Sequence, residues 1–89
     1  MKNNKTSILI RRPECLALTA RSKSALQHDI KQGLFCPPIA IGERAVAFIR
    51  HEVETIIQAR IEQQLPDQIK ILVKKLIKNR SANMGAQSQ

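Results

Sequence analysis

Apolar side chains recur at helical spacing along two stretches in the second half of this 89-residue chain. Across residues 50–64 the apolar stripe consists of Val53, Ile56, Ile57 and Ile61. Pro66 interrupts this pattern, and a second amphipathic stretch then extends to about Asn79. Its apolar positions are Ile69, Leu72, Val73, Leu76 and Ile77, and its polar face carries Lys70, Lys74, Lys75 and Lys78. The period of the two stripes predicts two helices, the second of them basic.

The first half of the chain predicts two shorter helices. Pro13 suits the first turn of a helix, where its missing N–H would be unbonded in any case, so the sequence predicts a helix over residues 13–18. After a short turn, the hydroxyl of Ser22 is placed to cap a second helix over residues 23–32. Gly33 ends that helix, because glycine readily adopts the left-handed conformation. The side of this helix that faces the core carries Ala25, Leu26 and Ile30.

Residues with strand propensity lie between the second and third predicted helices. Two runs, 38–41 and 45–49, flank Gly42-Glu43-Arg44, which is typical of a short β-hairpin with Arg44 at its tip. Residues 8–10 form a further short strand or pack on the core. Together the elements predict an α+β, mainly α, fold: a winged helix-turn-helix with a two-stranded β-hairpin wing and an extra C-terminal helix.

The charge of the chain favours a polyanionic partner. Fifteen Lys and Arg oppose seven Asp and Glu, which gives a formal net charge of +8. The bases are concentrated in the first and last thirds of the chain, and the acids in the middle third. Such a charge distribution attracts nucleic acid first and acidic membrane second. Because no aromatic residue anchors the last helix, no membrane partner is expected.

The second predicted helix has an outward face without acids. This face carries Lys23, Ser24, Gln27, His28 and Lys31, whereas Asp29 points elsewhere. Glutamine can pair with the edge of adenine through two hydrogen bonds, and lysine and histidine can donate to guanine or phosphate. We therefore expect this helix to read duplex DNA. The predicted DNA-contacting set is completed by Arg21 and Ser22 before the helix, and by Arg44, which is placed to touch a phosphate or a minor groove.

The order helix, tight turn, helix, glycine, hairpin, helix resembles the AlpA-type prophage regulators, small DNA-binding proteins related to phage excisionases and to the MerR-like winged-helix fold. The resemblance covers roughly residues 8–61. The matching residues are Ile10-Arg11-Arg12-Pro13-Glu14, Thr19, Ser22-Lys23-Ser24, Gln32-Gly33, Phe35, Pro38, Ile41-Gly42, Arg44-Ala45-Val46 and Glu52-Val53. The chain departs from the family pattern at Ala20 and Arg21 (usually a glycine and an aliphatic residue), at Gln27 (usually a tyrosine), at Ala40 (often basic) and at Phe48 (commonly a tryptophan).

The resemblance implies a sequence-specific double-stranded DNA-binding regulator of a prophage or genomic island. Some proteins of the family activate an integrase gene, and related excisionases bend DNA and bias integrase towards excision. Both roles start from the same DNA contact, so the choice between them stays open. Integrase is then a candidate partner, and the implied location is the bacterial cytoplasm, at the nucleoid. The departures at Gln27 and Ala40 bear on the preferred DNA sequence.

An enzyme and a metalloprotein are the first alternatives. No nucleophile stands beside a positioned base, so we expect no enzyme and no cofactor. His28 and His51 with Cys15 and Cys36 match no metal-ligand spacing, so no metal is predicted. The two cysteines lie in apolar surroundings without a CxxC pair, and they are expected to be buried free thiols in a reducing cytosol.

The more serious alternative is a protein-interaction module in which DNA binding is secondary. It rests on the apolar stripe of the last helix, which either packs on the third helix, forms a homodimer, or binds integrase or a second DNA-bound copy. Packing is the favoured interpretation, because Pro66-Asp67 provides a short turn suited to antiparallel neighbours.

The predicted organisation has four parts. Residues 1–7 are expected to be a disordered basic N-terminus, and residues 8–64 a winged helix-turn-helix DNA-binding domain. Residues 65–80 form the C-terminal basic amphipathic helix, and residues 81–89 a disordered tail. The apolar run at residues 8–10 is too short for the core of a signal peptide, and no stretch reaches the length of a membrane span.

Overall fold

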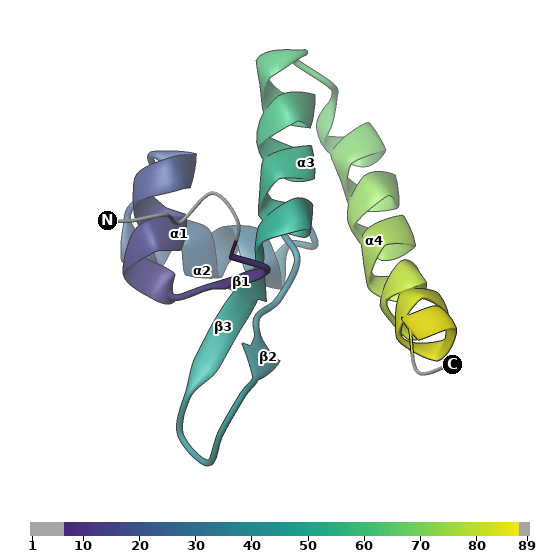
Figure 1. Cartoon of the computed structure of the whole chain (residues 1–89). Helices are drawn as coiled ribbons and strands as arrows, with labels where there is room; N and C mark the ends of the chain where they lie inside the picture. The colour runs from purple at the N-terminus through teal and green to yellow at the C-terminus, as the bar shows by residue number, and fades with distance from the viewer. Residues whose placement is uncertain (1–6, 88–89) are drawn as a thin grey trace.

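The computed structural model describes residues 7–87, with side chains described as far as Ser81. Its elements follow in the order β1 (Leu9–Ile10), α1 (Arg12–Thr19), α2 (Lys23–Lys31), β2 (Ile39–Ala40), β3 (Val46–Ile49), α3 (Arg50–Ile61) and α4 (Pro66–Gln87). Figure 1 shows α3 between the α1–α2 pair and α4, with the hairpin of β2 and β3 projecting from the start of α3. The arrangement confirms the predicted α+β, mainly helical, winged-helix-like fold.

The sheet has one strand more than the two-stranded wing that the sequence predicted. Its strand order is β1-β3-β2, and both pairs are antiparallel. Ile10 pairs with Phe48 near the core, whereas Ala40 pairs with Val46 farther out on the hairpin. The third strand comes from the short apolar run near the N-terminus. It pairs with the part of β3 that β2 does not cover, so β1 ties the N-terminal segment to the base of the wing.

Each of the first three helices ends at a left-handed residue: φ is 58° at Ala20, 78° at Gly33 and 61° at Gln63. After α2, the N–H of Gly33 donates to the carbonyl of Ile30 (3.1 Å), and the N–H of Leu34 donates to the carbonyl of Asp29 (2.8 Å). These bonds satisfy carbonyl groups that the helix end would leave free, so Gly33 ends α2 as predicted. Ala20 and Gln63 hold the same conformation with a Cβ, which costs roughly 1–2 kcal/mol per residue.

Replacing Ala20 with glycine is therefore expected to raise the free energy of unfolding by about 1 kcal/mol, because glycine adopts positive φ without the Cβ clash. The measurement is equilibrium urea unfolding of the wild type and the variant. Ala17→Gly is the matched control: Ala17 is exposed within α1, so the same substitution there should lower stability by about 1 kcal/mol. A loss of stability in both variants would contradict the left-handed assignment at Ala20.

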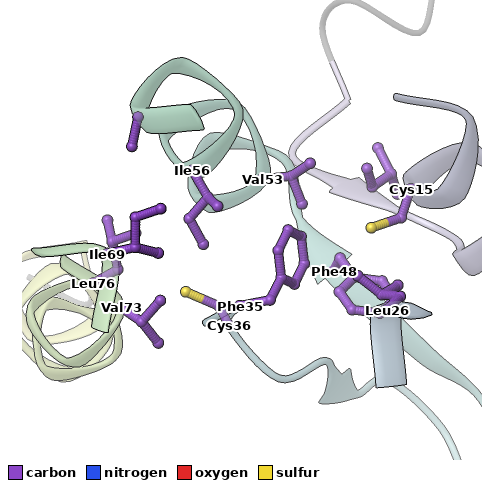
Figure 2. Close-up of a cluster of buried hydrophobic side chains, with 12 residues drawn as sticks. Cys15, Leu26, Phe35, Cys36, Phe48, Val53, Ile56, Ile69, Val73 and Leu76 are labelled. Carbon is purple, nitrogen blue, oxygen red and sulfur yellow. The ribbon is translucent and has the colours of Figure 1, made fainter. Parts of the chain in front are cut away.

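A single hydrophobic core includes residues from all four helices. At its centre Phe35 and Phe48 meet edge to face, with ring centroids 6.0 Å apart. Figure 2 shows side chains from α3 and α4 converging beside these rings. The buried cluster consists of Ile10, Cys15, Leu26, Phe35, Cys36, Phe48, Val53, Ile56, Ala59, Ile69, Val73 and Leu76. Because α4 contributes three of these residues, the favoured interpretation that it packs on α3 is confirmed.

The buried face of α3 differs from the predicted stripe. Ile61 is 67% exposed, although the stripe placed it in the core. It lies five residues after the fully buried Ile56, about 140° round the helix, and α3 ends there rather than near Gln64. The four buried residues of α3 are Val53, Ile56, Ala59 and Glu52, the last at 4% exposure, whereas Ile57 is only partly buried. Burial of Glu52 is not expected from the polar character of its side chain, and it depends on a partner elsewhere in the fold.

The apolar stripe of α4 is buried at some of its predicted positions and partly exposed at others. Ile69, Val73 and Leu76 are buried, whereas Ile77 is 38% exposed and Leu72 is partly buried. The lysines of the predicted polar face are all exposed. The helix continues to Gln87, past the predicted end near Asn79 and into the stretch expected to be a disordered tail. Residues 1–6, most of the predicted disordered N-terminus, and residues 88–89 lie outside the described part of the chain.

Cys15 and Cys36 are both buried free thiols, as predicted. Burial raises the pKa of Cys15 to about 11. Burial, together with the nearby carboxylate of Glu52, raises the pKa of Cys36 to about 12. Both side chains are therefore protonated at neutral pH, where they act as small apolar groups of the core.

Candidate nucleic-acid interface

The second helix, α2, starts as the sequence predicted. Ser22 is its N-cap, and the Oγ of Ser22 accepts a hydrogen bond from the N–H of Ala25 at 3.2 Å. Leu26 is fully buried, and Ala25 and Ile30 are partly buried beside it. One side of the helix is thus fixed against the core, which determines the side that faces outward.

The outward side of α2 is the predicted acid-free face. All five of its residues are exposed: Lys23, Ser24, Gln27, His28 and Lys31. The one acid of the helix, Asp29, is buried on the opposite side with 3% exposure. The outward face therefore combines cationic and amide donors with no carboxylate to neutralise them. That combination suits both the edges of bases and phosphate groups.

Asp29 connects the turn before α2 to α3. Arg21 donates to both of its carboxylate oxygens, from Nε at 3.0 Å and from Nη2 at 2.9 Å. Arg60 of α3 donates from Nη2 at 3.1 Å, and its guanidinium lies over the ring of Phe35. Burying a carboxylate is costly unless it is paired and hydrogen-bonded. The three bonds pair both oxygens of Asp29 with arginines, and they hold α2 in place relative to α3.

Arg21, one of the predicted DNA-contacting residues, is thus held by a residue of the protein itself. Its side chain keeps 39% exposure, and the fork contributes only two of its nitrogens to Asp29. A guanidinium carries five N–H donors, so the outer ones stay free to donate. In this structure the first role of Arg21 is to position the turn that leads into Ser22.

Arg44 is exposed at the end of the hairpin, where the sequence analysis placed it. The N–H of Ile41 donates to the carbonyl of Ala45 at 2.9 Å, which closes the loop around residues 42–44. Figure 1 shows this loop as the part of the chain farthest from the helices along the hairpin. The guanidinium of Arg44 is therefore carried at the tip of a projecting wing, separate from the face of α2.

Arginines and lysines have different environments in this protein. Every ion pair within 4.0 Å in the described part of the chain uses an arginine: Arg21, Arg50, Arg60 or Arg80. The described lysines take part in none of them and are exposed. The exposed lysines outside these ion pairs lie on α2 and α4, and Arg11 and Arg44 are likewise exposed outside them.

Several arginines have structural roles that were not predicted from the sequence. Arg50 joins three segments: it donates from Nη2 to Glu14 at 2.7 Å, from Nε to the carbonyl of Ser7 at 3.0 Å and from Nη1 to Glu54 at 3.3 Å. Arg12 lies over the ring of Phe48, with 5.7 Å between the guanidinium carbon and the ring centroid. Apart from Glu54, four residues after Arg50, these partners are distant in sequence, so no local pattern indicates the contacts.

One further hollow in the described part of the chain does not suit a polyanion. A polar hollow of about 430 Å³ lies between α3 and α4 and is lined by His51, Glu54, Thr55, Gln58, Ala59, Glu62, Gln64 and Leu72. Its two carboxylates disfavour phosphate there. Among the described residues, no group of His, Cys, Asp or Glu side chains could hold a metal ion. Nor is any helix in this part of the chain long and apolar enough to cross a membrane.

The fold and the exposed face define a small helix-turn-helix protein with a winged-helix-like architecture and an acid-free, basic outward helix. Residues 8–61 match the family described as "Prophage CP4-57 regulatory protein (AlpA)". Because this match covers more than half of the chain, the protein belongs to that family, and the predicted resemblance is confirmed. Searches of curated proteins and of solved structures gave no match. Family membership identifies a phage-related regulatory protein.

Proposed function

We propose that this protein is a sequence-specific double-stranded DNA-binding regulator of a prophage or genomic island, with α2 in the major groove. The observation that carries the proposal is the outward face of α2, whose five exposed residues include no acid. A helix presented on a rigid core is the element that helix-turn-helix proteins insert into the major groove. The family assignment covers residues 8–61, which we call the head, and it supports the same proposal.

The regulatory role proposed for the protein is control of integrase, either by activating integrase transcription or by acting as an excisionase. Both roles need the same head on DNA, and they differ in the site that is bound. The proposed location is the bacterial cytoplasm, at the nucleoid. The alternative of an interaction module loses its main support, because the apolar stripe on α4 is largely buried against α3.

Selection from a pool of random duplexes tests the proposed DNA binding. The full chain should enrich a defined sequence of a few base pairs, because α2 and the wing together offer only a few side chains to the bases. Footprinting on the element's integrase promoter and on its attachment site then separates the two roles. Retention of DNA without enrichment of any sequence would contradict sequence-specific recognition.

Arg44→Ala tests the proposed wing contact. A cation that neutralises one phosphate contributes about 0.9 to the slope of log K against log salt concentration, so the variant should lower that slope by about one unit. Specific and mixed-sequence duplexes should be affected alike, because phosphates carry no sequence information. The measurement is fluorescence anisotropy over a series of salt concentrations. An unchanged slope would show that the hairpin tip points away from DNA.

A further inference from the structure

The lysines of α4 form a second group of uncompensated positive charge. Lys70, Lys74, Lys75 and Lys78 are all exposed, and none belongs to an ion pair of the described residues. The acid nearest to them along the helix is Asp67, in the first turn. A surface that serves only solubility usually mixes charges of both signs. Here the signs are largely separated: the exposed carboxylates of Glu54 and Glu62 line the hollow beside α3, and α4 carries four exposed lysines against Asp67 alone.

Two contacts place one flank of α4 beside the C-terminal end of α2. A Cβ added at Gly33, which follows the end of α2, would lie 4.0 Å from Cγ of Lys70. Farther along α4, Nη2 of Arg80 donates to the carbonyl of Pro37 in the loop after α2, at 2.8 Å. Lys31, the last residue of α2, is exposed just before this junction. Basic residues thus continue from the end of α2 onto α4.

Helical spacing assigns the four lysines to different flanks. Lys70 and Lys74 are four residues apart, so they lie on the same side of α4, about 6 Å apart along its axis. Lys75 is three residues after Leu72, which lines the hollow that also contains Glu54 and Glu62. Lys75 therefore lies nearer the acidic side of α4. Lys78 lies about 80° round the helix from Lys70, turned away from the junction with α2. We refer to Lys70 and Lys74 as the α4 basic row.

We propose that the α4 basic row contacts phosphates of the duplex beyond the segment that α2 reads, and so extends the DNA contact on the side of the α2 C-terminus. This inference rests on the proposed DNA binding of the head. The chemistry of lysine indicates phosphate as the group bound by this row. Lysine is a point charge on a flexible stem, so it can contact a phosphate whatever the neighbouring base. The matched family region ends at residue 61, so the family assignment does not include this surface.

The test compares two double variants with the same change in charge. Lys70→Gln/Lys74→Gln removes the row, and Lys75→Gln/Lys78→Gln removes two exposed lysines of the same helix that lie outside it. The probe is a mixed-sequence duplex of about 30 base pairs, roughly three helical turns. The row variant should lower the salt slope by about two units and weaken binding at least about tenfold at low salt. The control variant should change the slope by well under one unit.

Duplexes in which single phosphates are replaced by a neutral group show where the α4 basic row contacts DNA. In a series of duplexes that carry the sequence selected by the full chain, single phosphates are replaced by methylphosphonates. Wild type should lose affinity at one or two phosphates flanking the selected sequence, and the row variant should be insensitive to those same replacements. Such non-additivity shows that the lysines and those phosphates interact. Full sensitivity in the row variant, or equal effects of the two double variants on the salt slope, would overturn the proposal.

The result also separates this inference from the function on which it rests. If selection enriches a sequence while the row variant binds like wild type, the head reads DNA and the row does not contact it. Selection could instead enrich no sequence while the row variant still loses about two units of salt slope on the mixed-sequence duplex. The phosphate contact of the α4 basic row would then be supported, and sequence-specific recognition would be contradicted. All the substituted lysines are exposed, so thermal melting should be nearly unchanged in both double variants.

Discussion

Replacing Arg80 with alanine is expected to lower the free energy of unfolding by about 3 kcal/mol, because the change leaves a buried carboxylate without its partner. Arg80 donates to Glu52 from Nε at 2.7 Å and from Nη2 at 2.6 Å. The side chain of Glu52 is 5% exposed, whereas that of Arg80 keeps 20%. The bidentate pair fixes α4 on α3, and the further bond to Pro37 extends this anchor to the loop after α2.

Thermal and urea unfolding measure this loss. A loss of about 3 kcal/mol corresponds to a fall in Tm of roughly 12–24 °C for a domain of this size. Lys78→Ala, an exposed lysine two residues earlier, should stay within about 0.5 kcal/mol of wild type. Adding Glu52→Gln to Arg80→Ala should recover part of the loss, since a neutral amide costs less to bury than a carboxylate. Equal stability of Arg80→Ala and wild type would show that α4 is not anchored through this pair.

Replacing both Lys23 and Gln27 with alanine is expected to remove most sequence-specific binding, because each should cost about 1–3 kcal/mol if it contacts a base edge. Both residues are exposed on the acid-free face of α2. Folding should be preserved, because neither is part of the core and the cap at Ser22 is left in place. The measurement is a gel-shift titration on the selected duplex and on a mixed-sequence duplex.

The matched control for these substitutions is Gln58→Ala with Lys78→Ala. It removes one glutamine and one lysine from exposed positions on α3 and α4, far from the face of α2. Binding to the selected duplex should fall only slightly in the control, through the lost charge. Loss of the preference for the selected over the mixed sequence should be confined to the α2 variant. Intact site-specific binding in the α2 variant would reject α2 as the reading helix.

The local parts of this structure were predictable because their signals lie within a few residues. Ser22 and Gly33 mark the two ends of α2, and the spacing of Leu26 and Ile30 determines which side is buried. The outward face then follows without knowledge of the rest of the chain. The position of the hairpin tip at Arg44 was predictable for the same reason, since turn residues stand between two strand-forming runs.

The long-range parts were not predictable, because their partners lie far apart in sequence. Asp29 is bonded by Arg60, 31 residues away, and Glu52 by Arg80, 28 residues away. An acid on an amphipathic helix is normally exposed to solvent, so the sequence around Glu52 does not indicate that this residue is buried beside α4. The predicted burial of Ile61 was wrong for a related reason. The last residue of a helix can match the apolar period of that helix and still lie outside its packed face.

The packing of α4 changes the interpretation of the basic C-terminal helix. Its apolar stripe is largely buried within the chain, and its lysines remain exposed, with Lys70 beside the end of α2. The same helix therefore stabilises the head through Arg80 and presents cations through its outward flank. The two roles are carried by different residues, so substitutions can separate stability from DNA affinity.

Chemical-shift mapping of the backbone amides during titration with the selected duplex tests most directly whether α2 and the wing form the DNA interface. The predicted result is that the largest changes cluster at residues 21–32 and 41–45, with smaller ones near Lys70. Changes concentrated on the α3 side of the hollow, around His51, Glu54 and Gln58, with α2 unperturbed, would contradict it.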